Sequence, residues 1–453
     1  MPQDLRSFLE QVKKKDPQDI CIIKKEVDPA YEITATVTKL EREAKRRPIL
    51  IFEKVKGSAF PVITNVHASR SRLALAMDTK PDKTQKAYLD ALDHPQAPKV
   101  VAKAPVKEII LKGKQLDLQQ LPQIVHHEGD AGPYITAAIS FAKDPTGTTT
   151  NCAYNRLMIK GKDTTSIHLT LAKHLWEFYH SAEANGRPLP VAFAIGVHPA
   201  IALGALANGS IDEDERGVMG ALLGEPLQLV KCETSDLLVP AHAEMIIEAE
   251  ILPKERTPEG PFGEFTGYSL GQRQREVVRV KAITHRRKAL FQDITVAHLD
   301  HLLLSTIPIE ASLYRSVRAI VPTVKTVRVP APFTCYVSIE QRVSGQAKNA
   351  ILAVLGSDIY MKRVVVVDHD VNLFNDREVA WAIGTRCQPD RDISIVTRTR
   401  GSDLDPSTQE DGFTAKWGVD ATAKPSLEAY TPRHGIPSDV WNRINLKDLV
   451  KDT

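Results

Sequence analysis

The sequence predicts a multidomain α/β protein, and three observations carry this prediction. At 453 residues the chain exceeds what one hydrophobic core usually organises, which suggests about two to four domains. Helical and strand-like segments alternate toward both ends of the chain, whereas strand-like runs dominate its middle. Hydrophobic residues make up 42% and charged residues 25%, as is typical of globular proteins. We therefore expect three domains, over residues 1–108, 109–307 and 308–453.

The N-terminal domain is predicted to be a small α/β unit. Apolar residues at helical spacing predict helices over 4–15 and 32–46. The apolar runs at 20–27 and 48–55 predict strands that alternate with these helices. The proline-rich stretch at 98–105 predicts the boundary to the next domain.

The middle domain is predicted to be rich in strands. Its strand-like runs are separated by turns that contain Gly, Pro, Asn or Asp. Helices are expected near 169–184, 200–208 and 213–223. The strand-like runs are YITAAISFAK, RLMIKG, VAFAIGV, LQLVKCE, AEMIIEAEIL and REVVRVKAIT.

The C-terminal domain is predicted to return to an α/β pattern. Its last stretch of about 45 residues is rich in Pro, Asp and Thr, and we expect an irregular arm that packs on another domain or subunit. The predicted strands are VKTVRV, TCYVSIE and RVVVVDHDV, and the predicted helices are IEASLYRSVRAI, SGQAKNAILAVLG and DREVAWAIGTR.

Composition and motif searches exclude several classes of function. The net charge of +3 and the scattered basic residues give no footprint for nucleic acid. Five cysteines without a CxxC pair argue against a disulfide framework or a zinc site, and they predict a reducing cytoplasm. No apolar run approaches the ~20 residues of a transmembrane helix, and the N-terminal segment lacks the apolar core of a secretion signal. Dinucleotide, P-loop, zincin and serine-hydrolase motifs are absent from the sequence.

The segment PEGPFGEFTGY holds the most informative motif, because Glu259 and Glu264 bracket a bend in it. One proline and two glycines between them favour a defined turn. Neighbouring phenylalanines would desolvate both carboxyl groups and raise their pKa toward the range useful for proton transfer. Taken alone, such a turn is also typical of an ordinary surface turn.

The segment TNCAYNR offers an amide at Asn151 and a guanidinium at Arg156 at a junction between a loop and a strand. Arg156 could bind a substrate carboxylate through two hydrogen bonds, or it could hold Glu259 ionised and so separate the protonation states of Glu259 and Glu264. From this segment alone, an exposed strand arginine is an equally good interpretation.

His174 and Glu215 lie in two predicted helices further along the chain. Together with Asn151 they form a mixed, mostly oxygen ligand set that suits Mn²⁺ or Mg²⁺ better than zinc. Nothing in one sequence brings the three together. Each taken alone is typical of an ordinary helix-face or helix-start residue.

Taken together, these residues resemble the UbiD-type decarboxylases, which use prenylated FMN to remove carboxylate groups from aromatic, heteroaromatic or α,β-unsaturated acids. The most specific signal is EGPFGE followed by TGY, with VPAHAE upstream. The resemblance covers nearly the whole chain, and its further segments are LRSFLEQ, TNCAYNR, KHLWEFY, DERGVMGALLGEPLQLVKCETSDLL and KRVVVVDHDVNLFNDREVAWAIGTRCQPDRD.

The resemblance implies a fold and a site. It implies that the middle domain is a split β-barrel like that of flavin reductases, and that the C-terminal α/β domain mediates oligomerisation, with a homodimer, sometimes assembled further. The implied catalytic residues are Arg156, Glu259 and Glu264; the implied Mn²⁺ ligands are Asn151, His174 and Glu215, with K⁺ nearby; the implied contacts to prenylated FMN are Asn151, Cys152, Ala153, Tyr154, Asn155, Arg156, Lys173, His174, Glu215 and Lys362.

The resemblance also implies a mechanism, in which the cofactor is the electron sink while CO₂ departs and Glu264 then protonates the carbon that lost it. A flavin prenyltransferase would supply the cofactor. His298 and His301 could recognise a second polar group of the substrate, such as a carboxylate, a hydroxyl or a ring N–H. Two alternatives stay open at this point: a metal-dependent hydrolase or phosphoesterase that uses Asn151, His174 and Glu215, and a non-catalytic flavin-binding module.

Overall fold

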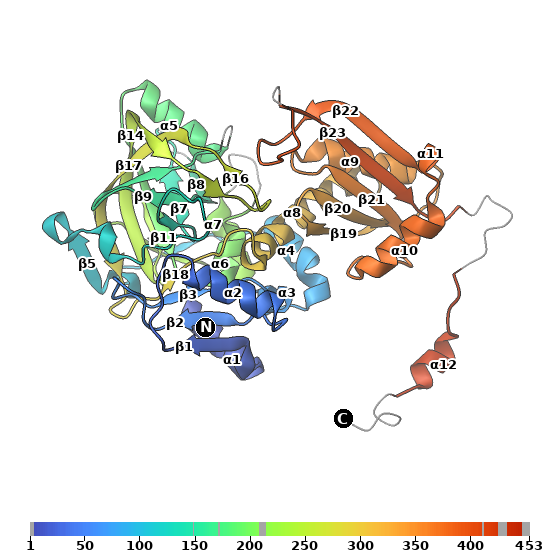
Figure 1. The fold of residues 1–453 in the computed structure, drawn as a ribbon, viewed down its shortest axis with the longest axis horizontal. Coiled ribbons are helices and arrows are strands. Elements are labelled where there is room, and N and C mark those ends of the chain that lie inside the picture. Colours follow the sequence, from blue (N-terminus) through green and yellow to red (C-terminus); the bar gives the residue numbers. More distant parts are fainter. Residues whose placement is uncertain are drawn as a thin grey trace.

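The computed structural model describes residues 4–147, 149–170, 173–207, 214–409, 412–424 and 433–445. The chain forms a mixed α/β, multidomain fold in which an N-terminal sheet, a large central sheet and a C-terminal sheet follow one another (Figure 1). The long helix α8 (Leu299–Ile320) lies between the central and C-terminal sheets (Figure 1). Among the described helices, none combines the length and the apolar character needed to cross a bilayer.

The N-terminal sheet has the strand order β1-β2-β3-β18. Its last strand comes from far along the chain, because β18 follows the central sheet and pairs in parallel with β3. The predicted first helix is confirmed: the side chain of Asp4 accepts a hydrogen bond from the backbone N–H of Ser7 at 2.8 Å and caps it. The elements are α1 (Leu5–Lys15), β1 (Ile20–Ile23), α2 (Glu32–Arg42), β2 (Ile49–Phe52), β3 (Val62–Thr64), α3 (Arg70–Ala76), α4 (Thr84–Asp93) and β18 (Phe291–Gln292).

The central sheet has nine strands, ordered β6-β9-β10-β17-β14-β11-β7-β8 with β5 paired to β17, and it curls into a half-barrel (Figure 1). Register shifts between the long strands β14 and β17 bend the sheet, as β-bulges do. The strands are β5 (Ile109–Lys112), β6 (Tyr134–Ile135), β7 (Ile139–Lys143), β8 (Thr150–Tyr154), β9 (Leu157–Ile159), β10 (Thr164–Ile167), β11 (Leu189–Ile195), β14 (Met245–Glu259) and β17 (Arg273–His285).

Helices and small sheets surround the half-barrel. The short strand β4 pairs with β12, so residues within the predicted boundary stretch 98–105 already pack against the middle of the chain. The elements are α5 (His174–Ala184), α6 (Pro199–Gly204), α7 (Glu215–Leu223), β4 (Lys99–Val100), β12 (Gln228–Lys231), β13 (Leu238–Pro240), β15 (Phe262–Gly263) and β16 (Ser269–Leu270).

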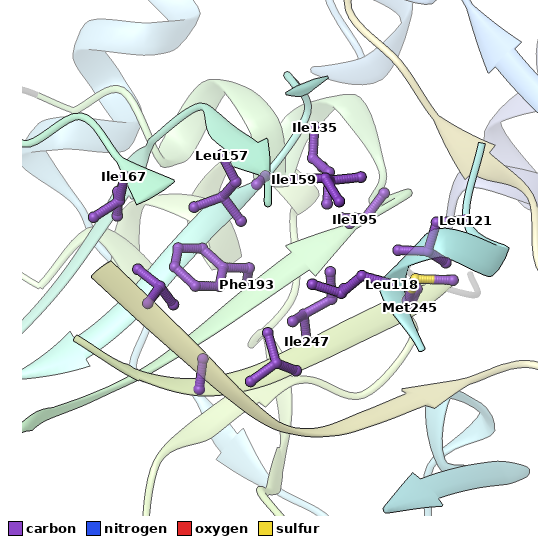
Figure 2. Close-up of a cluster of buried hydrophobic side chains, with 14 of the residues drawn as sticks. Leu118, Leu121, Ile135, Leu157, Ile159, Ile167, Phe193, Ile195, Met245 and Ile247 are labelled. Atoms are coloured by element: carbon purple, nitrogen blue, oxygen red, sulfur yellow. The ribbon is translucent and has the colours of Figure 1, made fainter. Parts of the chain in front are cut away.

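The inside of the half-barrel is filled by apolar side chains from several strands (Figure 2). Because side chains alternate between the two faces of a strand, every second residue of a run such as β11 points into this core. Each fully buried Leu, Ile or Phe contributes roughly 1.5–3 kcal/mol of hydrophobic free energy. The labelled members are Leu118, Leu121, Ile135, Leu157, Ile159, Ile167, Phe193, Ile195, Met245 and Ile247.

The C-terminal sheet has the order β19-β20-β21-β23-β22, with a parallel centre and antiparallel edge strands. Helix α12 lies apart from this sheet (Figure 1). The elements are β19 (Val324–Ala331), β20 (Thr334–Ile339), α9 (Gln346–Ser357), β21 (Arg363–Asp368), α10 (Asp376–Arg386), α11 (Pro389–Asp392), β22 (Ile393–Arg400), β23 (Phe413–Ala421) and α12 (Ser438–Arg443).

The structure adds detail to one expectation about the second half of the chain and corrects another. The predicted boundary at 307/308 falls inside α8, which continues through Pro308 because the residues around this proline are buried and held by tertiary packing. The predicted irregular arm is wrong for 413–421, which form β23 between β21 and β22. This segment contains the strand formers Phe413, Thr414, Trp417 and Val419, although the last stretch of the chain as a whole is rich in Pro, Asp and Thr. The predicted division into three domains stays a prediction.

Candidate active site

Three charged side chains meet beside the half-barrel although they lie far apart in the sequence. Arg156 follows β8, Glu259 ends β14 and Glu264 follows β15. The Nε and Nη2 atoms of Arg156 donate to the two carboxylate oxygens of Glu259 at 2.9 and 3.4 Å, and its Nη1 donates to Oε1 of Glu264. The exposed fractions of the three side chains are only 14%, 3% and 10%. The structure therefore brings the predicted Arg-Glu-Glu set into one buried hydrogen-bonded network.

The loop that carries the second glutamate is held by a neighbouring segment. The N–H of Gly260, whose φ is +82°, donates to the Tyr134 hydroxyl at 3.1 Å. Oδ1 of Asp130 accepts the N–H of Gly263 at 2.8 Å, and its Oδ2 accepts the N–H of His127 at 2.9 Å. A Cβ at Gly263 would lie 2.8 Å from Nδ1 of His127, so any other residue here would force the His127 ring to move. These contacts fix the position of the carboxylate pair.

The two glutamates have different electrostatic surroundings. Burial raises the pKa of Glu264, Arg156 opposes that rise, and the nearby charge of Glu259 adds to it. Glu259 has a second cationic neighbour, because Nε of Arg275 lies 4.0 Å from its Oε2. The guanidinium of Arg156 also lies 4.7 Å from the centroid of the Phe262 ring. Glu264 is therefore a carboxyl group that keeps its proton to a higher pH than an exposed glutamate does.

A cavity of about 210 Å³ opens beside this network. Its walls are mixed, and polar or charged side chains converge on it beside apolar ones, as in small-molecule sites. The lining residues are Thr136, Tyr154, Asn155, Arg156, His168, Thr170, Leu206, Phe262, Glu264, Ile294, Val296, His301, Leu304, Ser305 and Leu404.

The predicted substrate histidines separate in the structure. His301 lines the cavity. His298 does not, because its ring nitrogens lie 3.2 Å from Oε2 of Glu41 and 3.2 Å from Oγ1 of Thr38, both on α2. The geometry gives no support to a substrate contact by His298. His168 lines the cavity as well, and sequence reasoning missed it because its spacing resembles that of an ordinary strand-end histidine.

A second cluster unites Asn151 on β8 with His174 and Glu215, which begin α5 and α7. Oε1 of Glu215 accepts from the Asn151 amide at 2.9 Å and lies 4.0 Å from Nδ1 of His174. Its Oε2 accepts the N–H of Cys152 at 3.2 Å. Burial raises the pKa of Glu215 to about 7, because its partners here are neutral donors.

This cluster fits a hard divalent cation. A half-turn of the Asn151 amide would present its oxygen beside the Glu215 carboxylate and the His174 imidazole, giving two oxygens and one nitrogen. Among the described residues no group of three His, Cys, Asp or Glu forms a metal cluster, and this set contains only two such residues with an amide as third member. Glu215 is buried with only neutral donors around it, and a bound cation would stabilise its ionised form and offset the cost of that burial.

A second cavity, of about 320 Å³, adjoins the first and shares Tyr154, Asn155, Thr170, Leu206 and Ser305 with it. Most residues predicted to contact the cofactor lie in its wall. These are Asn151, Cys152, Ala153, Tyr154, Asn155, Lys173, His174 and Glu215.

Lys362 does not join them. Its Nζ atom donates to Oδ2 of Asp405 at 2.7 Å and to the hydroxyl of Ser407 at 2.5 Å, and it lines neither cavity. Because this ion pair already satisfies the ammonium group, the predicted cofactor contact of Lys362 has no support in this arrangement. Asp405 directly follows Leu404, which does line the first cavity.

Three family models match consecutive parts of the chain. They describe the N-terminal domain, the Rift-related domain and the C-terminal domain of 3-octaprenyl-4-hydroxybenzoate carboxy-lyase, and they match residues 13–92, 99–299 and 303–421. An anhydromevalonate phosphate decarboxylase of Methanothermobacter thermautotrophicus is 33% identical over 427 residues, which cover 92% of this chain and 96% of the relative. A phenolic acid decarboxylase of Sedimentibacter hydroxybenzoicus is 33% identical over 446 residues, covering 93% and 91%.

Solved structures agree with these matches. The UbiD-class enzyme HmfF from Pelotomaculum thermopropionicum, in complex with FMN, is 42% identical and superposes with a TM-score of 0.92 over 99% of this chain and 100% of that one. An evolved dimeric form of HmfF in complex with prFMN is 41% identical, with a TM-score of 0.88 over 99% and 100%. The chain belongs to the UbiD family.

Proposed function

We propose that this UbiD-family chain is a carboxy-lyase that uses prenylated FMN to decarboxylate an aromatic, heteroaromatic or α,β-unsaturated carboxylic acid. The observation that carries the proposal is the network of Arg156, Glu259 and Glu264 at one cavity, next to a second cavity with a candidate cation site. One cavity offers a proton donor and the other offers a place for a phosphate-bearing cofactor.

The second cavity is where the cofactor would bind. Asn151, His174 and Glu215 would hold Mn²⁺ against its phosphate, with K⁺ nearby, and the charge of Lys173 would favour the same anionic group. When bound, prenylated FMN supplies the electron sink that lets CO₂ leave the substrate carbon.

The first cavity would hold the acid. The apolar side chains of Phe262, Ile294 and Val296 exclude water from the reacting carbon. Arg156 orients the carboxylate pair, and Glu259 balances its charge. Glu264, which keeps its proton to a higher pH than an exposed glutamate does, donates that proton to the carbon that lost CO₂. By microscopic reversibility the same residues would support carboxylation at high CO₂.

The alternatives are less favoured. A metal-dependent hydrolase built on Glu215 would leave the neighbouring Arg-Glu-Glu network without a role. A non-catalytic flavin-binding module would not need a buried carboxyl group with a raised pKa inside its cavity.

The proposal also covers the supplier of the cofactor, the oligomeric state and the cellular location. A flavin prenyltransferase would supply the cofactor. A homodimer, or a larger assembly of the same chain, is proposed on the strength of the evolved dimeric form of HmfF. The five cysteines form no disulfide, which favours a reducing, cytoplasmic setting.

One experiment tests the core of the proposal. The chain is co-expressed with a flavin prenyltransferase, and the mass and absorption spectrum of the bound cofactor are measured. A panel of aromatic, heteroaromatic and α,β-unsaturated acids is then scored for CO₂ release. A modified flavin together with turnover of at least one acid is the expected result. Phosphate release from phosphoesters without any flavin would favour the hydrolase instead.

A further inference from the structure

A second guanidinium lies beside the carboxylate network. Arg275 belongs to β17, which runs antiparallel to β14 (Figure 1), and it pairs in register with Thr257. Because paired residues and residues two apart on a strand share one face of a sheet, Arg275 lies on the same face as Glu259. Its Nε atom lies 4.0 Å from Oε2 of Glu259. The register of the sheet therefore places this second cation beside the carboxylate.

The Nε–H group of Arg275 is a donor without an acceptor. It is buried, and it has no hydrogen-bond partner among the described residues, whereas buried donors in proteins nearly always have one. Arg156 holds Oε2 of Glu259 less firmly than Oε1, since its Nη2 lies 3.4 Å from Oε2 and its Nε lies 2.9 Å from Oε1. A shift of about 1 Å would bring Oε2 within hydrogen-bond distance of Arg275.

Arg156 contacts both glutamates and also faces the place of the acid. In the described part of the chain, the wall of the first cavity includes Arg156 and Glu264 but neither Glu259 nor Arg275. A substrate carboxylate that binds beside Arg156 would share this guanidinium with Glu259. If Glu264 is protonated, two anions then face Arg156. One cation alone would leave a buried negative charge unbalanced, which is strongly unfavourable.

The other titratable groups around the network do not replace Arg275. Lys160 interacts with Glu259 but is exposed, so water and salt screen its charge. Burial, assisted by the charges of Arg156 and Arg275, lowers the pKa of His168 to about 3, so this imidazole is neutral near neutral pH. The remaining groups supply no positive charge, and they are Tyr134, Tyr360 and Asp403.

We propose that Arg275 is a positioning residue, which balances the charge of Glu259 while Arg156 binds the carboxylate of the acid. Two cations then face two anions. When CO₂ leaves, the second anion is lost from the cavity, and Arg156 balances the carboxylate that Glu264 becomes on giving up its proton. This inference rests on the proposed decarboxylase function and deepens it, because it explains how the buried site accepts a carboxylate.

Binding of charged and uncharged probes tests the role of Arg275. The acids 4-hydroxybenzoate and furan-2-carboxylate are compared with their amides, 4-hydroxybenzamide and furan-2-carboxamide, by calorimetry. The cofactor-loaded Glu264→Gln protein is used as the parent, because it lacks the proposed proton donor and should not consume the acids. Adding Arg275→Gln should raise the Kd of each acid by at least about tenfold, since the acid then brings in an unbalanced anion. The Kd of each amide should stay nearly unchanged.

Two further variants separate charge from shape. Arg275→Lys keeps a cation at this position and should retain most of the acid binding. Arg279→Gln is the matched control, because Arg279 lies on the same strand and its partner is the exposed Asp163, and it should leave the ratio of acid Kd to amide Kd at the parental value.

The pH dependence of turnover gives a second readout, in enzyme that keeps Glu264. Loss of a nearby cation lets the coupled carboxyl pair hold its proton to a higher pH. In Arg275→Gln the alkaline fall in the rate should therefore move to higher pH, and KM for the acid should rise more than kcat changes. Arg275→Lys should restore the parental profile, which the loss of a purely structural contact would not require.

The outcomes separate this inference from the proposed function. An acid-to-amide ratio that Arg275→Gln leaves unchanged would overturn the inference, as would equal losses of acid binding in Arg275→Gln and Arg275→Lys. If the acids bind in the expected order but none is turned over, the decarboxylase proposal fails and the role of Arg275 in binding stands. If the parent protein binds neither acid, both fail.

Discussion

Two buried carboxylate sites on the same half-barrel differ in how their charge is balanced. In the first, Arg156 donates to both Glu259 and Glu264, so the chain supplies its own cation. In the second, Glu215 accepts hydrogen bonds from the Asn151 amide and the Cys152 N–H, which carry no net charge. At the first site the protein itself supplies the positive charge that balances a carboxylate. At the second site, a proton or a bound metal ion must neutralise the buried carboxylate of Glu215.

This difference in charge balance indicates a different chemical role for each site. A balanced network can hold a proton on one member and keep its geometry, which is what a proton donor needs. A buried carboxylate with only neutral partners gains most from a bound cation, which is what a metal ligand needs.

The largest expected effect comes from removing the proton of the first site. Glu264→Gln keeps the size of the side chain but cannot donate a proton as an acid, so decarboxylation should fall by about 1,000-fold. CO₂ release and the absorption spectrum of the cofactor are measured on the same preparation, and the cofactor should remain bound. Glu250→Gln, which removes a half-exposed ion pair between Glu250 on β14 and Lys281 on β17, is the control and should keep the parental rate. A Glu264→Gln enzyme with parental activity would refute the proton-donor role.

The second prediction concerns Arg156, which balances the negative charge of the carboxyl groups at the first site. In Arg156→Met the two glutamates lose their shared cation, and one buried charge is left unpaired. We expect a loss of about 3–5 kcal/mol in the free energy of unfolding, measured in urea near neutral pH, and a fall of about 100-fold in CO₂ release. Arg279→Met removes the exposed contact with Asp163 and should cost at most about 1 kcal/mol. Equal losses in the two variants would contradict the comparison.

The third prediction is that the second site, formed by Asn151, His174 and Glu215, binds a divalent cation. Mn²⁺ should raise the thermal midpoint of the cofactor-free protein, since a ligand at about 100 times its Kd stabilises the folded state by about 2.7 kcal/mol. Glu215→Gln should abolish this shift, and Glu264→Gln should retain it. A shift that survives in Glu215→Gln, or that disappears in Glu264→Gln, would place the cation elsewhere.

The fourth prediction has a smaller expected effect and concerns Asp130, whose hydrogen bonds hold the loop of the first site. Asp130→Asn keeps one acceptor for the N–H of Gly263 but turns a donor toward the N–H of His127, so the loop should shift. We expect kcat to fall by about tenfold with KM nearly unchanged, and the alkaline limb of the pH profile to move. Asp28→Asn, which removes an exposed pair with Lys56, serves as the control. An unchanged pH profile would indicate that Asp130 has only a structural role.

The fifth prediction concerns pH and is the most gradual. Burial raises the pKa of Glu264 above its ordinary value, so its proton is present at low pH and is lost as pH rises through the folded-state pKa. The rate should therefore fall on the alkaline side. The stability that this group contributes should fall over the same range, because the unfolded state binds the proton less tightly. In Glu264→Gln the fall of the residual decarboxylation rate on the alkaline side should disappear. If that fall persists in the variant, it is caused by the titration of another group.

Local motifs predicted much of the site. Glu259 and Glu264 share one bend whose glycines and proline are visible in the sequence, and Asn151 and Arg156 share another short segment. The partners that complete these motifs were not visible. Asp130 and Tyr134 hold the carboxylate loop from 133 and 126 residues away, and no spacing rule connects them to it. Lys362 was assigned from a neighbouring strand pattern, and its contact with Asp405 depends on how a distant loop folds back.

The sequence by itself determined the multidomain α/β class, most helices and strands, and the residue types of both carboxylate sites, because periodicity, turn chemistry and motifs are local properties of a chain. Only the tertiary structure decided which charges are balanced. Arg156 and Glu259 are 103 residues apart, and their contact exists because the half-barrel brings the ends of β8 and β14 together. Burial also set the protonation of the site residues. It raises the pKa of Glu264 and Glu215, and it lowers the pKa of His168 and His301, which therefore stay neutral. Desolvation depends on side chains packed together from distant segments, so no single stretch of sequence reveals it.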